Sequence, residues 1–236
     1  MIGTKGGYPI PTREWGNRYI YPRLAADETI PRPQTDFEQL ENTRVQLGNA
    51  KCVWYNEADK SEVSEARIMN MKTDRMIIRD FTMNDINDMQ AILGDAETMK
   101  NCEPAYTIEK TAVFLQKFCI EKRGAVAAVH KDTAKVIGYI LFHELNDGVY
   151  EIGWFFNRAF WGQGLAYESC KAVIDYAFDK MNAHKVFAET IDGMKSVHLM
   201  KKLGMKAEGI QRSQTKDSSG SWADVYLYGL LSEDRQ

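Results

Sequence analysis

One segment of the sequence, Tyr150–Ala166 (YEIGWFFNRAFWGQGLA), limits the fold more than any other. Its first half combines aromatic and β-branched side chains with no helical period, which predicts a strand. Gly162 and Gly164 follow, and apolar residues at helical spacing then continue to Met181. A strand, a glycine turn and a helix in succession direct unpaired backbone N–H groups at one point, where the helix dipole favours an anion. Because glycine has no Cβ, a phosphate can approach this main chain, and the segment predicts a pyrophosphate-binding loop.

Two common phosphate-binding loops do not fit these residues. A Walker loop needs Lys followed by Ser or Thr after its second glycine, where this chain has Leu165-Ala166. The dinucleotide-binding fingerprint needs a third glycine, and none is correctly placed. A pair of surface turns that bind nothing remains as the alternative interpretation of the two glycines.

The segment resembles motif A of the GNAT family of N-acetyltransferases, whose loop reads Q/R-x-x-G-x-G/A and holds the pyrophosphate of coenzyme A. The matching frame here is Trp161-Gly162-Gln163-Gly164-Leu165-Ala166, with Trp in the Q/R place. The longer string FWGQGLAYE is similar to the branch that contains ribosomal-protein N-terminal acetyltransferases. The later string Lys201-Lys202-Leu203-Gly204-Met205 strengthens the resemblance, which covers the chain from about Met71 to its C-terminus.

Composition and charge narrow the class of protein. The chain has 236 residues, 44% of them hydrophobic, and a formal net charge of −3, so no basic face for nucleic acid is expected. The cysteines lack C-x-x-C spacing, and no stretch resembles a signal peptide or a membrane span. We therefore expect a cytoplasmic protein with no nucleic-acid or membrane partner.

Residues 1–70 differ in composition from the rest. Most of the prolines lie in residues 1–34 together with several aromatic residues, which favours an extended, turn-rich path. The aromatic content argues against a simple disordered tail. We expect this N-terminal extension, whose fold is unassigned, to act as a lid over the catalytic domain or as an arm in a homodimer.

For residues 71–236 the resemblance implies an α/β (α+β) fold, in which a mixed, twisted sheet is flanked by helices. The pattern of side chains predicts the element order β-α-α-β-β-β-α-β-α-β-β. Thr82 and Asp85 form a weakened capping box that opens the first helix, and Gly94 ends it. The second helix begins at Thr107 and continues to about Lys122, with three residues expected to face inward: Val113, Phe114 and Phe118. The predicted strands are Met76–Arg79, Ala125–His130, Lys135–Glu144, Glu151–Phe156 and Lys185–Thr190, and the later helices are Ala166–Met181 and Met194–Leu203. The chain is expected to end in a hairpin whose turn is Asp217-Ser218-Ser219-Gly220 and whose last strand is Ala223–Leu230.

The resemblance also implies how acetyl-CoA, the expected co-substrate, is held. Its pyrophosphate would lie on the N–H groups of Gly162, Gln163, Gly164, Leu165 and Ala166. Its pantetheine arm would pair with the strand that contains Trp154, Phe155 and Phe156, because this strand parts from the next one in GNAT domains. The N–H of Trp154 or Phe155 would then face the thioester carbonyl as the oxyanion donor. The sequence leaves open which of the two it is.

Catalytic side chains are less clearly indicated. Glu151 on the cofactor strand is the candidate general base, and Glu189 on the next strand is the second candidate; a solvent-facing structural carboxylate is the alternative for Glu151. At the Asn and Tyr positions of the family's last-helix pattern this chain has Gly193 and Met200. Ser196 stands at the Ala/Ser position of the same pattern. It could protonate the leaving thiolate, or it could bond to a backbone carbonyl as helix serines do.

Other reactive residues are expected to be structural. The four histidines lack metal-ligand spacing, so no metal is expected. Cys170 is expected to pack within a helix. Three lysines could meet the 3′-phosphate of the cofactor or form a solvated face: Lys171, Lys201 and Lys202.

The resulting hypothesis is acetyl-CoA-dependent N-acetylation of a primary amine by direct attack in a ternary complex. The acceptor is either a small-molecule amine or a peptide N-terminus. A polycationic acceptor would require several nearby carboxylates, for which the candidates are Glu103, Glu144, Asp147, Glu151 and Glu189. The alternative is a non-catalytic acyl-CoA sensor whose N-terminal segment binds a partner.

Overall fold

The structure, a computed structural model, describes residues 69–235. The predicted N-terminal extension therefore lies outside the described residues, except for its last two. The described chain forms one eight-stranded sheet in the order β1-β2-β3-β4-β5-β6-β8-β7. The neighbouring strands are antiparallel except β5 and β6, which are parallel, so the sheet is mixed as expected.

The element bounds agree closely with the sequence patterns. The strands are β1 (Asn70–Lys72), β2 (Met76–Arg79), β3 (Ala125–His130), β4 (Lys135–Asn146), β5 (Val149–Phe156), β6 (Lys185–Thr190), β7 (Lys206–Lys216) and β8 (Trp222–Leu231). The α-helices are α1 (Ile86–Leu93), α2 (Ala96–Met99), α3 (Ile108–Phe114), α4 (Leu165–Met181) and α5 (Lys195–Lys202). Short β1 and α2 were not expected from the sequence.

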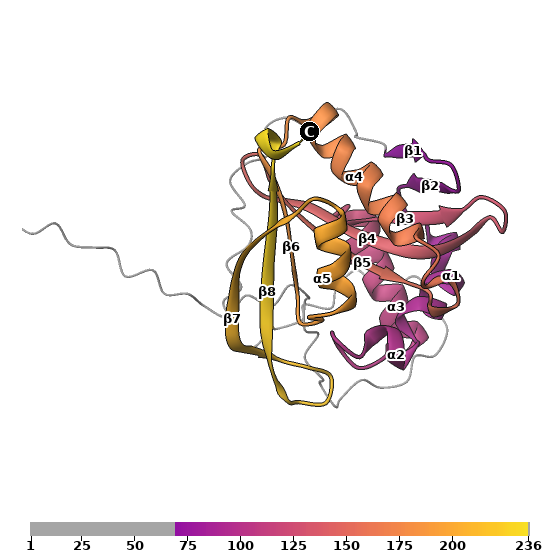
Figure 1. The fold of residues 1–236 in the computed structure, drawn as a ribbon. Coiled ribbons are helices and arrows are strands. Elements are labelled where there is room, and N and C mark those ends of the chain that lie inside the picture. Colours follow the sequence, from indigo (N-terminus) through magenta and orange to yellow (C-terminus); the bar gives the residue numbers. More distant parts are fainter. Residues whose placement is uncertain (1–68, 236) are drawn as a thin grey trace, which may run out of the picture. The chain divides into compact units, whose positions relative to one another are not determined.

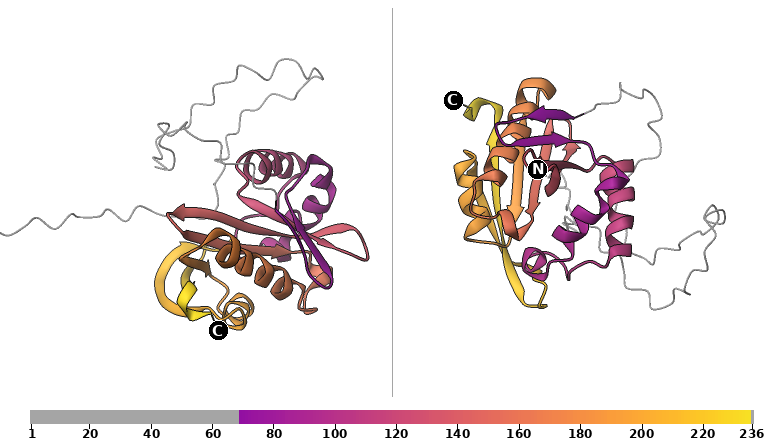
Figure 2. Two further views of the ribbon diagram at one scale, coloured as in Figure 1. Left: turned by 90° about the horizontal axis from the view of Figure 1, so that it is seen from above. Right: turned by 90° about the vertical axis from the view of Figure 1, so that its right-hand side faces the viewer.

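Helices cover both faces of the sheet (Figures 1 and 2). Helices α1 and α3 lie on one face, and α4 and α5 lie on the other. The apolar stripe predicted in α4 is buried as expected: Val173, Ile174 and Ala177 are at most 1% exposed and pack in one core with strand residues such as Ile152 and Val186. Burial of this stripe holds α4, and therefore the glycine turn before it, against the centre of the sheet.

Strands β5 and β6 separate soon after they meet. Their register pairs are Val149 with Lys185, Tyr150 with Val186 and Glu151 with Phe187. Beyond Glu151 the pairing of β5 with β4 continues to Phe156, while β6 continues to pair with β8 as far as Thr190. A gap therefore opens between two strands that are each held on their other side, which confirms the strand separation implied by the resemblance.

The second predicted helix differs from expectation in its inner face. It is an α-helix only to Phe114 and continues as a π-helix, η3 (Leu115–Glu121). Phe114, Leu115 and Cys119 are buried, whereas Val113 is 47% exposed. The prediction that Val113 faces inward was wrong because the buried face passes through residues 111, 114 and 115, and the wider π turn then shifts it to residue 119. Phe118 is half-buried and stacks on Phe114.

Asp85, one of the two capping residues predicted before the first helix, is buried and forms an ion pair with the partly exposed Arg79. Asp85 accepts a hydrogen bond from the Thr82 N–H at 2.9 Å and a bidentate pair from Arg79 at 2.7 and 2.8 Å. Burial alone would raise the pKa of Asp85. The hydrogen bonds and charge of Arg79 and the Thr82 N–H outweigh that effect and hold its pKa below the ordinary 3.8.

This pair predicts a pH-dependent stability difference. Asp85→Asn should lower the free energy of unfolding by about 2 kcal/mol at pH 7, because Arg79 loses the buried carboxylate that balances its charge. Since the pKa of Asp85 is depressed, its contribution is present above pH 3.8 and is lost as the pH falls through the folded-state pKa. Urea unfolding at pH 7 and pH 3 should therefore show a smaller difference at pH 3. The matched Asp132→Asn variant, in an exposed turn, should be neutral at both. A pH-independent difference would contradict this account.

Candidate acetyl-CoA site

The predicted pyrophosphate loop lies between β5 and α4. After β5, the short 3-10 helix η4 (Arg158–Phe160) leads into Trp161, and Gly164 is the N-cap of α4. Gly162 and Gly164 have φ values of +75° and +77°, the left-handed region that glycine enters without strain. Below the loop, the Trp161 indole Nε1–H donates to the Phe156 carbonyl at 2.7 Å and ties the loop to the end of β5.

The N–H groups of this loop have no acceptor within residues 69–235. No hydrogen bond to another group of the chain is found for the N–H of Gly162, Gln163, Gly164, Leu165 or Ala166, and no side chain caps α4. A Cβ placed on Gly162 would meet nothing within 4 Å, so the space beside it is open. The first turn of a long helix and an open glycine loop thus present their donors together, which is the arrangement that binds phosphate groups.

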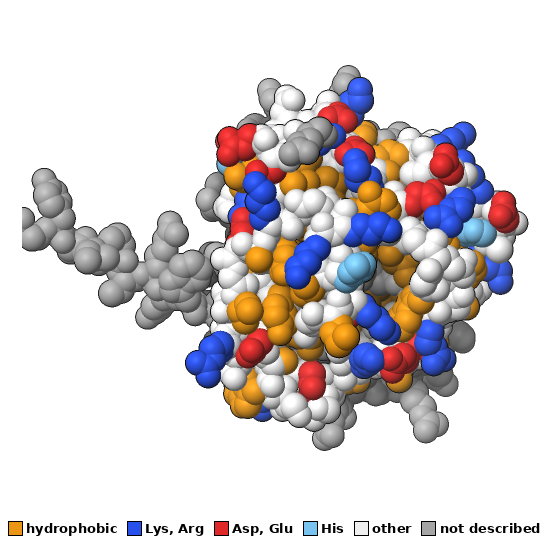
Figure 3. Space-filling view, in the orientation of Figure 1, with side chains coloured by type: hydrophobic (Ala, Val, Ile, Leu, Met, Phe, Trp, Pro, Cys, Tyr) orange, Lys and Arg blue, Asp and Glu red, His pale blue; other side chains and the backbone are white. Residues whose placement is uncertain are grey.

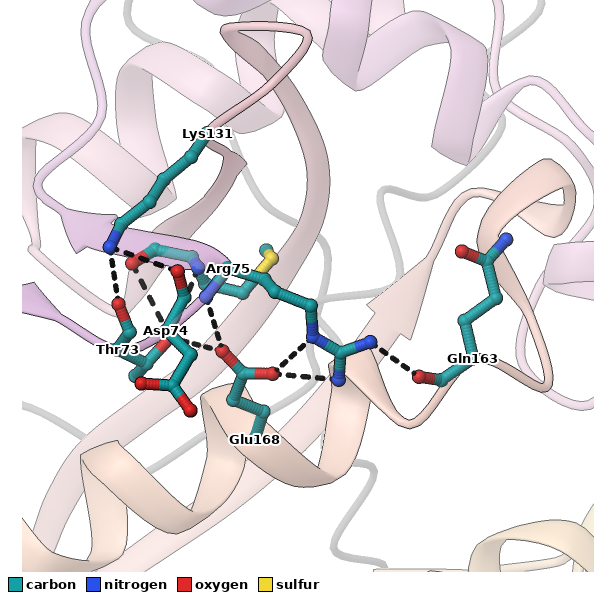
Figure 4. Close-up of polar contacts among 7 residues, drawn as sticks. Thr73, Asp74, Arg75, Lys131, Gln163 and Glu168 are labelled. Atoms are coloured by element: carbon teal, nitrogen blue, oxygen red, sulfur yellow. Dashed lines mark hydrogen bonds and ion pairs between the residues drawn. The ribbon is translucent and has the colours of Figure 1, made fainter.

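A network that the sequence did not reveal supports the loop from the side (Figure 4). From the turn between β1 and β2, Arg75 donates through Nη1 to the Gln163 carbonyl at 2.9 Å and through Nε to Glu168 at 2.8 Å. Glu168 lies in the first turn of α4 and also accepts from the Arg75 N–H at 2.7 Å and from the Thr73 hydroxyl at 2.5 Å. Partial burial alone would raise the pKa of Glu168, but these hydrogen bonds together lower it.

Basic residues gather on the face that carries α4 and α5 (Figure 3). Lys195 Nζ lies 4.6 Å from the centroid of the Trp161 ring, and Lys202 Nζ lies 4.5 Å from that of Tyr167. Lys171, by contrast, forms an ion pair with Asp175 one turn along its own helix, and Lys201 is exposed. Of the three lysines considered from the sequence, Lys202 is the one seen in contact with a residue at the start of α4.

The aromatic side chains of the predicted cofactor strand are packed into the protein. The Phe156 side chain is 5% exposed, and Trp154 packs against the same core. Phe155 projects to the other face and stacks on Tyr139, with ring centroids 5.1 Å apart. Contacts of these residues with a cofactor would therefore be made by the backbone of the strand.

The two candidate bases lie on one face of the sheet. Glu151 pairs in register with Phe187, and Glu189 is two residues further along β6, so both carboxylates project to the same side where the strands separate. Glu151 is only 6% exposed. The sequence did not indicate that His143, on the neighbouring strand, lies with Nε2 3.5 Å from Glu151 Oε2. Burial lowers the pKa of His143, which keeps it neutral at pH 7.

Ser196 lies in the first turn of α5 and contacts a carboxylate. Its Oγ donates to Asp192 Oδ2 at 3.5 Å, and its N–H donates to the same oxygen at 3.3 Å. Asp192 Oδ1 accepts from the N–H groups of Met194 and Lys195, so Asp192 caps this helix. The backbone-carbonyl contact considered from the sequence is not the one observed.

The remaining reactive groups have structural surroundings. Cys170 is fully buried in α4, and burial raises the pKa of its thiol, so it is not an activated nucleophile. Among the described residues, no group of His, Cys, Asp and Glu side chains is arranged to hold a metal ion. None of the helices in residues 69–235 is long and apolar enough to cross a membrane.

Comparison with known proteins gives the family. The sequence model of the acetyltransferase (GNAT) domain matches residues 75–206. The chain is 30% identical over 169 residues to a Bacillus subtilis protein named uncharacterized N-acetyltransferase YnaD, covering 70% of this chain and 99% of YnaD. The chain belongs to the GNAT acetyltransferase family, as the resemblance implied, and it is an acyltransferase. Use of acetyl-CoA is implied by membership of the family.

Two solved structures illustrate the shared fold. Ribosomal-protein-S5-alanine acetyltransferase from Vibrio fischeri aligns with a TM-score of 0.62 at 16% identity, covering 71% of this chain and 99% of that one. Spermidine N-acetyltransferase from Vibrio cholerae, solved with CoA and spermine, aligns with a TM-score of 0.61 at 19% identity, covering 69% and 98%. At these identities the comparison shows the fold and leaves the acceptor open.

The open loop predicts different effects of the same substitution at two glycines. Gly162→Ala should cost about 1 kcal/mol in stability from its left-handed backbone and should weaken CoA binding by about tenfold or more, because its methyl group would stand where a phosphate approaches. Gly220 has a similar φ of +87° and equally open surroundings, but it lies in the β7–β8 turn. Gly220→Ala should cost the same stability without changing CoA affinity. Isothermal titration with CoA measures the affinity of each variant, and thermal unfolding measures its stability. Equal CoA affinities of Gly162→Ala and Gly220→Ala would contradict the site.

Proposed function

We propose that this chain transfers the acetyl group of acetyl-CoA to a primary amine, with the cofactor pyrophosphate held by the N–H groups of residues 162–166. The observation that carries this proposal is the loop itself. Within the described chain its N–H groups lack acceptors, its glycines leave open space, and it is joined to the end of β5. An anion at that position would meet oriented donors and the positive end of α4.

The gap between β5 and β6 suits the pantetheine arm. A chain of amides entering beside β5 beyond Glu151 would pair with the strand as an added strand does. The pairing of β5 with β4 holds this backbone rigid on its other side. The N–H of Trp154 is then the proposed oxyanion donor at the thioester carbonyl. The Phe155 N–H is the weaker candidate, because the Asn157 N–H donates to the Ile137 carbonyl and the alternation along the strand turns the Phe155 N–H to the same side, toward β4.

We assign Glu151 as the general base, with Glu189 as the second candidate. The amine nitrogen attacks the thioester carbon, the carbon–sulfur bond breaks, and coenzyme A leaves as a thiolate while the amine proton passes to the carboxylate, directly or through water. No acyl-enzyme is needed, because within residues 69–235 no activated nucleophile was found. His143 beside Glu151 is neutral and adds no charge that would favour the ionised carboxylate.

Ser196 remains the proposed donor of a proton to the thiolate. Its contact with Asp192, at 3.5 Å, is at the long end of hydrogen-bond distances, so the hydroxyl can turn toward a sulfur at little cost. Coenzyme A thiolate is a tolerable leaving group, and turnover should therefore be slowed rather than abolished in Ser196→Ala.

The surroundings favour an acceptor with few positive charges. Of the carboxylates considered for a polycation, Glu103 is paired with Lys110 at 2.8 Å, and Glu144 accepts the Gly148 N–H at 2.9 Å in the β4–β5 turn. Glu151 and Glu189 remain where the strands separate, which suits the single ammonium of a small-molecule monoamine or a peptide N-terminus, and we propose such an acceptor in place of a polyamine. The polyamine in the complex with the Vibrio cholerae neighbour belongs to that protein, which shares only the fold.

The last part of the proposal concerns residues 1–70, which are an addition to the catalytic domain proposed for residues 71–236. We propose that they form a lid or a dimer arm in a cytoplasmic enzyme. The competing function, a non-catalytic acyl-CoA sensor, is favoured by Gly193 and Met200 standing where the family pattern has Asn and Tyr.

Turnover separates the two functions. The purified full-length chain should release coenzyme A from acetyl-CoA when offered monoamines and short peptides, measured by thiol titration with mass spectrometry of the acetylated product. Acetyl-CoA at about a hundred times its dissociation constant should also stabilise the fold by about 2.7 kcal/mol. Stabilisation without amine-dependent thiol release would favour the sensor, and absence of both would contradict the proposed function.

The base assignment makes a separate prediction. Glu151→Gln should lower kcat by about a hundredfold and leave the affinity for CoA unchanged, since the carboxylate acts on the amine. The control is Glu144→Gln, an exposed residue of the neighbouring strand that keeps an acceptor for Gly148. Its kcat should equal that of the wild type. If Glu151→Gln is fully active, the base is Glu189 or solvent.

A further inference from the structure

We infer that Arg75 is a positioning residue for the coenzyme A pyrophosphate: it holds the Gln163–Gly164 peptide so that the Gly164 N–H faces the anion. The inference rests on the proposed function, because it concerns the same loop. Neither the sequence pattern nor the family match assigns a role to Arg75, which lies 88 residues before Gln163.

The geometry of one peptide bond carries the argument. Arg75 Nη1 donates to the Gln163 carbonyl at 2.9 Å (Figure 4). In a planar trans peptide the carbonyl and the following N–H point in opposite directions, and the described chain has no cis peptide bonds. Fixing the carbonyl toward Arg75 therefore turns the Gly164 N–H to the other side of the loop. Because Gly164 has φ of +77° and no side chain, the loop would otherwise rotate easily about this peptide.

Arg75 is itself held firmly. Its N–H and Nε both donate to Glu168, and its carbonyl accepts the Lys131 N–H at 2.9 Å. The Lys131 ammonium bonds to the Asp74 carbonyl at 3.1 Å, and the Thr73 N–H donates to the Met76 carbonyl at 3.0 Å. The guanidinium is thus presented by a cross-braced turn, although its side chain is 47% exposed. An exposed arginine with this many fixed partners is a support for the loop rather than a mobile surface charge.

Glu168 explains why a cation is required beside the loop. Its carboxylate lies in the first turn of α4, close to where the pyrophosphate would bind, and by itself it would repel that anion. Arg75 Nη2 lies 2.7 Å from Glu168 Oε2 and balances its charge. Arg75 therefore has two separable effects, orientation of the peptide and neutralisation of Glu168.

Two variants separate these effects. Arg75→Gln removes both and should weaken CoA binding by about tenfold or more, measured by isothermal titration. Arg75→Gln combined with Glu168→Gln removes the repulsion but leaves the Gln163 carbonyl without its guanidinium donor. If Arg75 orients the peptide, the double variant should remain about as weak as the single one. Nitrogen relaxation of the Gly164 amide without ligand should show a lower order parameter in both variants, because the peptide is no longer held through the Gln163 carbonyl.

The outcomes distinguish this inference from the proposed function. Arg212→Gln, the same change at an exposed position of β7, is the control and should bind CoA as the wild type does. Recovery of wild-type affinity in the double variant would overturn orientation and leave only charge balance. Equal affinities of wild type and Arg75→Gln would overturn the inference while the acetyl-CoA site stands. If the wild type itself fails to bind CoA, both are wrong.

Discussion

The parallel pairing of β5 and β6 lasts for only three residue pairs, and the candidate site depends on where that pairing ends. Each strand is bound on its other side to an antiparallel partner, so neither can bend back to close the gap. The buried stripe of α4 fixes the helix across the same region of the sheet. The gap, the end of β5 and the start of α4 thus meet at one place. Three separate sets of contacts bring them there: the pairing of β5 with β4, the pairing of β6 with β8, and the packing of α4 on the sheet.

Most of the fold could be predicted from the sequence, because strands and helices are indicated by the spacing of apolar residues within short segments. The strands Met76–Arg79, Ala125–His130 and Lys185–Thr190 have the predicted bounds, and the α4 stripe is buried as expected. Alternation and helical spacing report directly on which side chains face a core. The error at Val113 lies in the α-helical part of its segment, where the buried face passes through residues 111, 114 and 115 and leaves Val113 outside it; only beyond Phe114 does the π-helix change the spacing.

The loop could be predicted for the same reason, but its support could not. Two glycines after a strand and before a helix are a local pattern, whereas Arg75 and Glu168 are 93 residues apart in the sequence. Nothing in either neighbourhood indicates the other. The contacts of Glu151 with His143 and of Ser196 with Asp192 have the same character, because side-chain pairing across strands and helix ends depends on register and capping that spacing alone does not fix.

The site that emerges relies on the backbone more than on side chains. The aromatic residues of β5 are used for packing, and the loop offers N–H groups at glycines. The most direct test is therefore a nitrogen–proton NMR titration of glycine-labelled protein with CoA. The account predicts that the amide signals of Gly162 and Gly164 move while that of Gly220, in the distant turn, does not. Movement of other glycine signals with Gly162 and Gly164 unchanged would show that the pyrophosphate does not lie on this loop.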